Sequence, residues 1–536
     1  MKRSLYISLL VASALGYTGC QKFLNTEPTD TLTTQDYYDS ETKLTGALAG
    51  VYDIIGSAYL YGDYLFSEIG ASTDEGFYAR SGTTTGIMVN NFDFTNDRVR
   101  GLWADCYRGI DRANNLLANS HLAKMEDKKR QAIVGEAQFL RGYYYFLLAT
   151  YFGGVPLRLT PTTTPENPSQ ARASVKEVYD QILKDMTEAE GKVAPSSAIG
   201  YASRVSKTVV QGVLARVCLH MAGYPLQDKS KYADALAWAK KVKESGEHAL
   251  LTSFDASLTN SAYSQIFINH ARDVYEVKES MWEADFKGNR TDGYTETGRV
   301  GNTIGITMTS TTFMADTGYS YGFIKGTGKL YNLYGAGDLR RDWVLTTYTY
   351  NATTGARVPI AAGTNAYGRD AAKWRRSFEV VKPKNQNHSP INYPILRYSD
   401  VLLMLAEADN QANNGPSAEA YEAVNQVRRR AYGLPLGTAS ATADLAAGLT
   451  KDQFQQAIED ERARELCFES LRRQDLVRWG KLVQVMNATG ADMATNGGGS
   501  AYGALGGRNI SQKHLLFPIP SSEMALNKAM IQNPGW

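Results

Sequence analysis

The residues best placed to do chemistry lie in one charged run, ERARELCFESLRRQDLVRWG, residues 461–480. Glu465 and Glu469 stand four apart, so on a helix they share one face, and glycosidases use two carboxyl groups roughly 5–10 Å apart. Arg472 and Arg473 follow Glu469 at the intervals where opposite charges pair along a helix. The run therefore favours a salt-bridged helix face, and a glycosidase built on Glu465 and Glu469 is the minor hypothesis.

Other catalytic and metal-binding patterns are missing or incomplete. The six histidines include no H-E-x-x-H pair, and no G-x-S-x-G elbow occurs. Gly326-Thr-Gly328-Lys329 resembles a phosphate loop, but Leu330 stands where Ser or Thr would bind magnesium. We therefore expect a protein that is not an enzyme and has no cofactor. The sequence leaves open whether a structural calcium ion is bound, because calcium ligands follow no fixed spacing outside EF-hands.

The N-terminal residues MKRSLYISLLVASALGYTGC predict an export signal. Lys2 and Arg3 precede about a dozen mostly apolar residues, fewer than the roughly 20 that a membrane-spanning helix needs. A small residue, Gly19, followed by Cys20 is the pattern of bacterial lipoproteins, in which the signal is cut before a cysteine that receives lipid. We predict that residues 1–19 are the signal peptide and that Cys20 is lipidated. A signal cut elsewhere, with Cys20 incidental, is the alternative.

The composition is that of a globular protein, with 43% hydrophobic and 21% charged residues among 536. Removing residues 1–19 takes two of the 57 basic residues and leaves 55 against 55 acidic ones. This balance argues against nucleic-acid binding. The three cysteines beyond Cys20 lie in apolar helical stretches, so we expect buried thiols without a disulfide framework. The 33 tyrosines suit a wet, adaptable binding surface.

Helical periodicity dominates residues 40–245. In ASVKEVYDQILKDMTEA the apolar residues recur every three or four positions, and Ser174 and Glu177 form a capping box. RQAIVGEAQFLRGYYYFLLA, SKTVVQGVLARVCLHMA and KYADALAWAKKV repeat the pattern. Short gaps and small residues predict antiparallel helix pairs stacked as in tetratricopeptide repeats.

Residues 246–392 change in character and are rich in Thr, Gly, Tyr and Asn, which predicts loops with short strands. Trp282 and Trp374, within this stretch, are expected in the core. Helical periodicity returns at Arg397 and continues in the long segment from Thr450, before a proline-punctuated end that we expect to pack down as an extended tail. The predicted fold is mainly α, a scaffold of stacked helix pairs with a loop-rich insertion. Its regions are 20–245, 246–392 and 393–536.

Six segments in order resemble the SusD/RagB family of bacterial outer-membrane lipoproteins over nearly the whole chain. After the cysteine the family has a Phe-Leu-acid-x-x-Pro start, here with Asn25 in place of the acid. The six segments are FLNTEP (23–28), LWADCYRGIDRANNLL (102–117), GEAQFLRGYYYFLLATYFGGVPL (135–157), YPILRYSDVLLMLAEADN (393–410), the 461–480 run, and the closing PIP…QNPGW.

This resemblance implies a function at the cell surface. Such proteins are anchored by lipid in the outer membrane, face outward, and cap a SusC-like, TonB-dependent transporter. They bind an oligomeric nutrient, usually a glycan, and deliver it to the transporter without catalysis. An oligopeptide-binding member of the same family is the alternative, and the sequence does not name the glycan.

A sugar oligomer presents apolar C–H faces and many hydroxyls, so a binder offers exposed flat rings beside polar groups. In the resemblance, the loop before the tryptophan-bearing helix contributes to the glycan site. One candidate set lies in STDEGFYARSGTTTGIMVNNFDF (72–94), and the second lies in the insertion; ordinary loop packing is the alternative for each ring. The predicted ligand-binding residues are Asp74, Glu75, Phe77, Tyr78, Arg80, Tyr294, Tyr319 and Tyr321.

Overall fold

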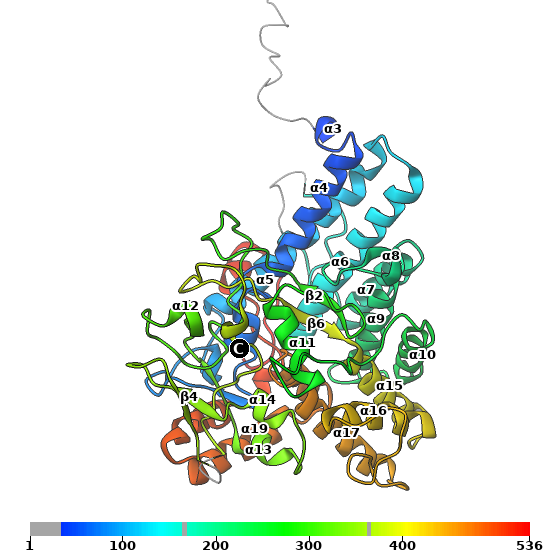
Figure 1. Ribbon diagram of the computed structural model, residues 1–536. Coiled ribbons are helices and arrows are strands. Elements are labelled where there is room, and N and C mark those ends of the chain that lie inside the picture. The colour runs from blue at the N-terminus through cyan, green and yellow to red at the C-terminus, as the bar shows by residue number, and fades with distance from the viewer. Residues whose placement is uncertain (1–33, 163–168, 362–365) are drawn as a thin grey trace, which may run out of the picture.

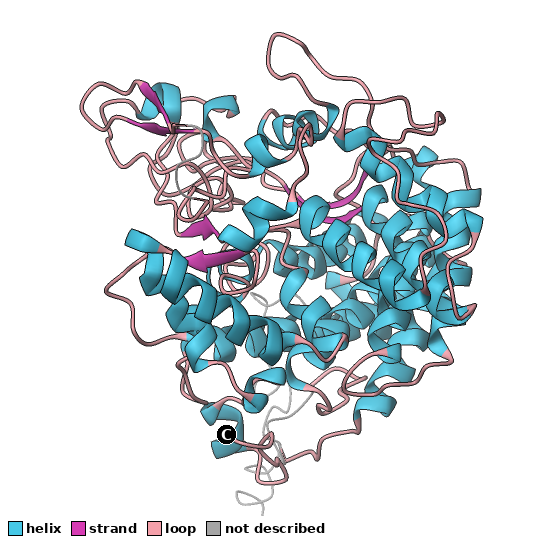
Figure 2. Cartoon of the chain, turned by 90° about the horizontal axis from the view of Figure 1, so that it is seen from below, coloured by secondary structure: helices cyan, strands magenta, loops and turns pink. Residues whose placement is uncertain are grey.

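The computed structural model describes residues 34–162, 169–361 and 366–536. The predicted signal peptide, Cys20 and the FLNTEP segment lie outside the described residues. Within them the chain is mainly helical, as predicted. Helices fill one side of the molecule, and most loops and short strands gather on the other (Figure 1; Figure 2).

The N-terminal region forms paired helices (Figure 1). α5 packs on α6, α6 on α7 and α9 on α10, which agrees with the predicted stacking. Their bounds are α3 Thr34–Tyr37, α4 Glu41–Tyr52, α5 Asp97–Asn119, α6 Asp127–Phe152, α7 Val175–Glu190, α8 Ser196–Ile199, α9 Lys207–Ala222 and α10 Lys231–Glu244.

Local signals account for these helices and their close packing. The Ser174–Glu177 capping box is present at the start of α7. Gly109 on α5 has no room for a side chain, because a Cβ there would lie 2.4 Å from the Tyr144 ring of α6. Small residues at such crossings allow two helix axes to approach. From Ile133 onward α6 is buried on nearly every side, so it forms the centre of the scaffold.

The middle region holds short elements, as predicted, and its strands join distant parts of the chain. β1 (Gly76–Tyr78) pairs with β3, β2 with β6, and β4 with β5, all antiparallel. Trp282 on β2 and Trp374 are both fully buried, which confirms their prediction as core. The bounds are α11 Ala262–Ala271, β2 Ser280–Ala284, α12 Met314–Thr317, β3 Ile324–Gly326, α13 Gly328–Leu333, α14 Arg341–Val344, β4 Tyr348–Tyr350 and β5 Arg357–Pro359.

The C-terminal region returns to helices. α15 packs on α10, α16 and α17, and a capping box joins Thr450 and Gln453 at the start of α17. The chain end packs down, with the Asn533 side chain donating to the carbonyls of Phe152 and Phe517. The bounds are β6 Tyr393–Arg397, α15 Tyr398–Ala412, α16 Ala418–Ala431, α17 Lys451–Leu466, α18 Arg472–Arg478, α19 Leu482–Asn496, α20 Leu505–Asn509 and α21 Ser521–Leu526.

The charged 461–480 run is not one helix face, which corrects the sequence interpretation. α17 ends at Leu466, and the turn that follows places Phe468 and Ser470 at φ of 64° and 62°. Glu465 and Glu469 are therefore not i,i+4 neighbours on a helix. Both are buried and pair with cations from distant segments. Those partners are Arg340, Arg397 and Arg430 for Glu465, and Lys373 and Arg397 for Glu469.

This environment also argues against the glycosidase hypothesis. Burial raises the pKa of both carboxyls, but the surrounding guanidinium and ammonium groups outweigh it, and each pKa lies below its usual range. A glycosidase needs one carboxyl with a raised pKa as general acid. Glu465 and Glu469 are therefore structural groups, buried in ion pairs with cations from distant segments.

Glu465→Gln is expected to lower the free energy of unfolding by about 3–5 kcal/mol, because it leaves buried guanidinium groups without their counter-charge. Chemical denaturation monitored by circular dichroism measures the loss. The matched control is Asp39→Asn, which removes the partner of Lys43 in an exposed pair and should cost less than about 1 kcal/mol. Equal small effects would contradict the structural role.

Candidate functional site

Strand pairing brings the two predicted ligand-binding segments together. Tyr78 on β1 lies opposite Ile324 on β3, and the Ala79 N–H donates to the Phe323 carbonyl at 2.7 Å. The 72–94 loop and the 319–323 segment are thus neighbours although about 240 positions separate them in the sequence.

Four rings line up at this junction, and we call them the aromatic surface: Tyr78, Tyr319, Tyr321 and Phe323. The ring centroids of Tyr78 and Phe323 are 5.5 Å apart, Phe323 and Tyr321 stack at 5.3 Å, and Tyr321 meets Tyr319 edge-on at 5.1 Å. Tyr78, Tyr321 and Phe323 are half-buried, and Tyr319 is buried. Three rings therefore keep part of their area available to a ligand.

Two arginines flank the aromatic surface. The Arg80 guanidinium lies 4.6 Å from the Phe323 ring centroid and donates to the carbonyls of Ala79 and Tyr321 at 2.8 and 2.7 Å. Within the described part of the chain Arg80 has no carboxylate ion-pair partner. The Arg299 guanidinium lies 5.7 Å from the Tyr321 ring. These donors beside apolar rings match the mixed chemistry of a sugar or a peptide.

Asp74 and Glu75 lie beneath this surface instead of on it. Arg472 donates to both Asp74 oxygens at 2.8 and 2.7 Å, and Lys329 donates at 2.7 Å. Burial raises the pKa of Asp74, but these two cations outweigh it and hold the pKa well below its usual range. For Glu75 burial dominates and raises the pKa to about 8, although Arg472 opposes it. Both carboxyls support the strand and do not face solvent.

Phe77 is also internal, with 2% of its surface exposed. It packs on Met493 and Ala504 and meets the Tyr502 ring edge-on at 5.8 Å. Neighbouring residues of a strand point to opposite faces. Tyr78 therefore reaches the aromatic surface while Phe77 enters the core, which corrects the expectation that both rings are exposed.

The remaining predicted ring, Tyr294, is not part of the aromatic surface. It is 48% exposed, and the Lys287 amine stands 6.0 Å from its ring centroid. Phe323, by contrast, was not among the predicted residues although it lies at the centre of the aromatic surface. Its signal is present in the sequence, because Tyr319, Tyr321 and Phe323 alternate as residues on one face of an extended strand do.

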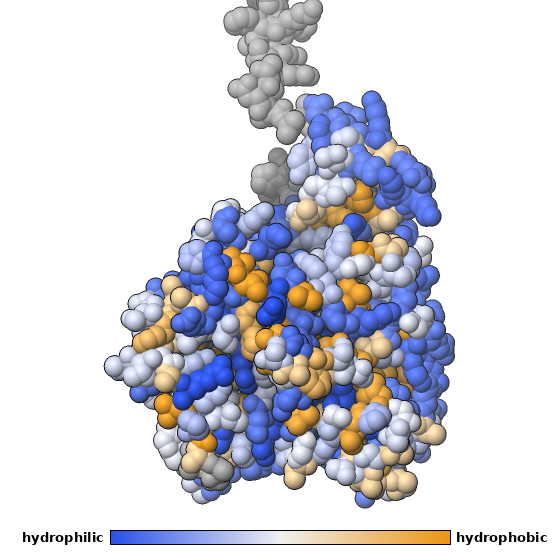
Figure 3. All heavy atoms as spheres, in the orientation of Figure 1, coloured by the Kyte–Doolittle hydropathy of each residue, from blue (hydrophilic) through white to orange (hydrophobic). Residues whose placement is uncertain are grey.

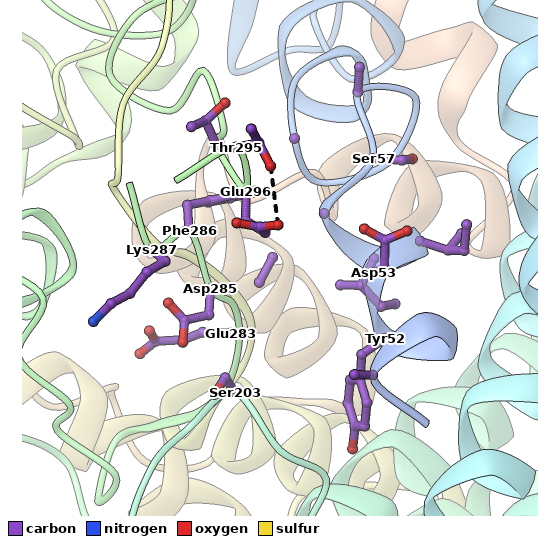
Figure 4. Close-up of a pocket in the computed structure, with 18 of the residues that line it drawn as sticks. Tyr52, Asp53, Ser57, Ser203, Glu283, Asp285, Phe286, Lys287, Thr295 and Glu296 are labelled. Atoms are coloured by element: carbon purple, nitrogen blue, oxygen red, sulfur yellow. Dashed lines mark hydrogen bonds between the residues drawn. The ribbon is translucent and has the colours of Figure 1, made fainter. Parts of the chain in front are cut away.

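A cavity of about 760 Å³ lies beside the aromatic surface. Figure 4 shows Tyr52, Asp53 and Ser57 on one side of it and Glu283, Asp285, Lys287 and Glu296 on the other. Arg299 lines the cavity and also contacts the Tyr321 ring, so the two features adjoin. No sequence pattern indicated this cavity, because its walls come from separate stretches within residues 45–63, 201–204 and 282–299, together with Arg108 and His388.

The described ranges offer little sign of a metal site or a membrane span. They contain no group of three or more His, Cys, Asp or Glu side chains placed to hold a metal ion. None of the helices in these ranges combines the length and apolar character needed to cross a membrane. Cys106, Cys218 and Cys467 are buried free thiols, as predicted. On the face in Figure 3, hydrophobic side chains form small groups separated by hydrophilic ones.

A helical scaffold that presents half-buried rings beside a cavity of mixed lining is the architecture of a ligand-binding protein. Two family models match the chain, "SusD family" over residues 278–536 and "Starch-binding associating with outer membrane" over residues 22–219. A solved SusD homologue from Bacteroides thetaiotaomicron is 30% identical, with a TM-score of 0.85 over 96% of this chain and 100% of that one. The chain belongs to the SusD family.

Further relatives are similar to this chain over nearly its full length. SusD-like protein P2 of Formosa agariphila is 25% identical over 99% of each chain. A solved protein described as a laminarin binding SusD-like protein is 23% identical, with a TM-score of 0.69 over 93% of this chain and 100% of that one. The second likeness concerns the fold alone.

Phe77→Ala is expected to lower the free energy of unfolding by about 3–5 kcal/mol, because it empties a packed site. Tyr78→Ala removes a ring of similar size from the half-buried side of the same strand and should cost less than half as much. Denaturant midpoints of the two variants measure the difference. Equal losses would place both rings in the same environment and contradict the assignment of Phe77 to the core.

Proposed function

We propose that this protein is an outer-membrane lipoprotein that binds an oligosaccharide or polysaccharide outside the cell and delivers it to a SusC-like, TonB-dependent transporter. The observation that carries the proposal is the aromatic surface, in which Tyr78, Phe323 and Tyr321 form a continuous row of partly exposed rings. Membership of the SusD family supports it, as does the description of the family model that matches residues 22–219.

The chemistry of the row suits a sugar chain. Pyranose rings present apolar C–H faces that stack on aromatic rings, and their hydroxyls need donors and acceptors close by. The Arg80 guanidinium lies against the Phe323 ring, and the Tyr321 hydroxyl donates to Asn387 at 2.9 Å. A row of rings with polar groups between them binds successive sugar residues along a chain.

The protein acts by binding and not by catalysis in this proposal. Glu465 and Glu469, the carboxyl pair that a glycosidase would use, are buried in ion pairs with lowered pKa values. Asp74 is likewise held by Arg472 and Lys329. In this proposal the ligand is not altered chemically while it is bound, and it then passes to the transporter.

Phe323→Ala and Tyr321→Ala should each weaken glycan binding by about 1–3 kcal/mol, by analogy with the stacking of bases on aromatic side chains. Isothermal titration against laminarin, amylopectin, levan, xylan and polygalacturonate identifies the ligand and measures the loss. Phe254→Ala is the matched control, since Phe254 is 45% exposed and lies outside the aromatic surface; its affinity should equal that of the wild type.

The outcomes of this titration separate the alternatives. Binding of mixed oligopeptides, with no response to any glycan, would favour the peptide-binding alternative. If no glycan binds, and if no barrel protein co-purifies with the chain from native outer membranes, the proposal is wrong.

The lipid anchor is proposed at Cys20. Cys20→Ala should abolish incorporation of radiolabelled palmitate and release the protein from the membrane fraction, because a thiol is the acceptor for the lipid. Cys106→Ala, which changes a buried cysteine, should keep both. Membrane retention and labelling of Cys20→Ala would contradict the anchor.

A further inference from the structure

We propose that the cavity beside the aromatic surface is a second subsite, which takes the end of the bound chain and selects a sugar residue with hydroxyl or amino donors and no carboxylate. This inference rests on the proposed function and adds where the end of the bound sugar chain lies and which chemical groups its last residue carries.

The cavity has the dimensions and the mixed lining of a small-molecule site. Its volume of about 760 Å³ lies within the roughly 300–1,000 Å³ of ligand pockets. Apolar side chains from two sides of the molecule contribute to its lining, and polar groups complete it. The apolar members are Leu48, Ala49, Ile54, Ile55, Ala58, Trp282, Ala284 and Phe286.

Most cations in the lining already have carboxylate partners. Arg108 pairs with Asp105 at 2.9 Å, Arg204 pairs with Glu136, and Arg299 pairs with Asp63 at 3.1 Å. The two others, Lys287 and Arg290, are exposed. In Figure 4 Lys287 extends away from the wall that carries Asp53 and Ser57.

Most of the carboxylates in the lining, in contrast to its cations, lack an ion-pair partner among the lysines and arginines of the described ranges. They are Glu283, Asp285 and Glu296. Asp285 accepts from the Tyr275 hydroxyl at 2.6 Å through one oxygen, and its buried Oδ1 has no hydrogen-bond partner. Glu283 is 3% exposed; one oxygen accepts from Asn392, and the other lies 3.3 Å from His270 Nε2, its one ion-pair partner in the described ranges.

A buried acceptor oxygen that lacks a hydrogen-bond donor favours a ligand that supplies one. Sugar hydroxyls and amino groups donate to carboxylates in charge-assisted hydrogen bonds. A uronic or sialic acid residue would instead place a further negative charge next to Asp285 and Glu296, and like charges at close range repel. The lining therefore favours a neutral or amino sugar.

One chain can occupy the cavity and the aromatic surface together. Arg299 lines the cavity, and its guanidinium lies 5.7 Å from the Tyr321 ring. Its Nη1 and Nε donate to Asp63 and Asn302, both at 3.1 Å, so its position is fixed between the two. A chain lying on the rings reaches the cavity past this residue, and its last residue enters.

The test is saturation-transfer NMR on the full-length protein in detergent. The probes are the methyl glycosides of glucose, galactose and mannose, then glucosamine, glucuronate and galacturonate. At least one neutral or amino sugar should bind at least tenfold more tightly than the uronates. The double variant Asp285→Asn, Glu296→Gln should weaken that sugar at least tenfold and remove the discrimination. The control, Asp127→Asn with Asp180→Asn, alters two exposed carboxylates and should change nothing.

Three results would overturn the inference: no monosaccharide binds, the uronates bind as tightly as the neutral sugars, or the double variant behaves as the wild type. The proposed function fails separately, through the absence of polysaccharide binding in the titration above. Tyr321→Ala distinguishes the two sites, because it should weaken polysaccharide binding and leave the monosaccharide signal in place.

Discussion

Arg397 lies at the centre of a buried ion-pair cluster on which the arrangement of the chain depends. It donates to Glu469 at 2.9 and 2.7 Å, to Glu465 at 2.8 Å and to Glu279 at 3.0 Å. These acids come from α17, from the turn after it and from the residue before β2, so one guanidinium joins the C-terminal helices to the middle region. Buried ion pairs are costly to desolvate and costly to break, so a fold in which one of these carboxylates missed its cation would leave an uncompensated buried charge.

The same segment also supports the aromatic surface. Arg472, just beyond the turn, holds Asp74, which lies two residues before β1. The Thr327 hydroxyl donates to the Asp74 carbonyl at 2.6 Å, and the Thr327 N–H donates to the Glu75 carbonyl at 3.1 Å. β1 and β3 are thus fixed from below by charge and by hydrogen bonds, and the rings above them are pre-positioned. A site that is rigid before binding loses less entropy when the ligand arrives.

In the proposed function, the aromatic surface and the cavity contribute differently to ligand recognition. The rings offer apolar area that any sugar chain can use, whereas the carboxylates of the cavity respond to the charge and donors of one residue. Arg299 belongs to both. Affinity would come mainly from the row of rings and selectivity mainly from the cavity, because stacking tolerates many sugars and buried acceptors do not tolerate a negative charge.

Much of the scaffold could be predicted from the sequence, since helix signals act over a few residues. The capping boxes at Ser174 and Thr450, the apolar stripes of α6, α7, α9 and α10, and the buried Trp282 all follow from local spacing. The order of six segments was enough to indicate the family. The structural character of the 461–480 charges was also predictable, although their partners were not.

Only the tertiary structure decided which residues meet. Whether Phe77 or Tyr78 faces the surface depends on how β1 lies against β3, and a loop sequence does not contain that information. The carboxylates of Glu465 and Glu469 find cations up to 125 positions away, beyond the reach of any helical spacing. The cavity is assembled from several such segments at once. Periodicity and helix caps depend on contacts within one or two helical turns, so a sequence pattern can indicate them. A binding site depends on contacts between distant parts of the chain that only folding brings together.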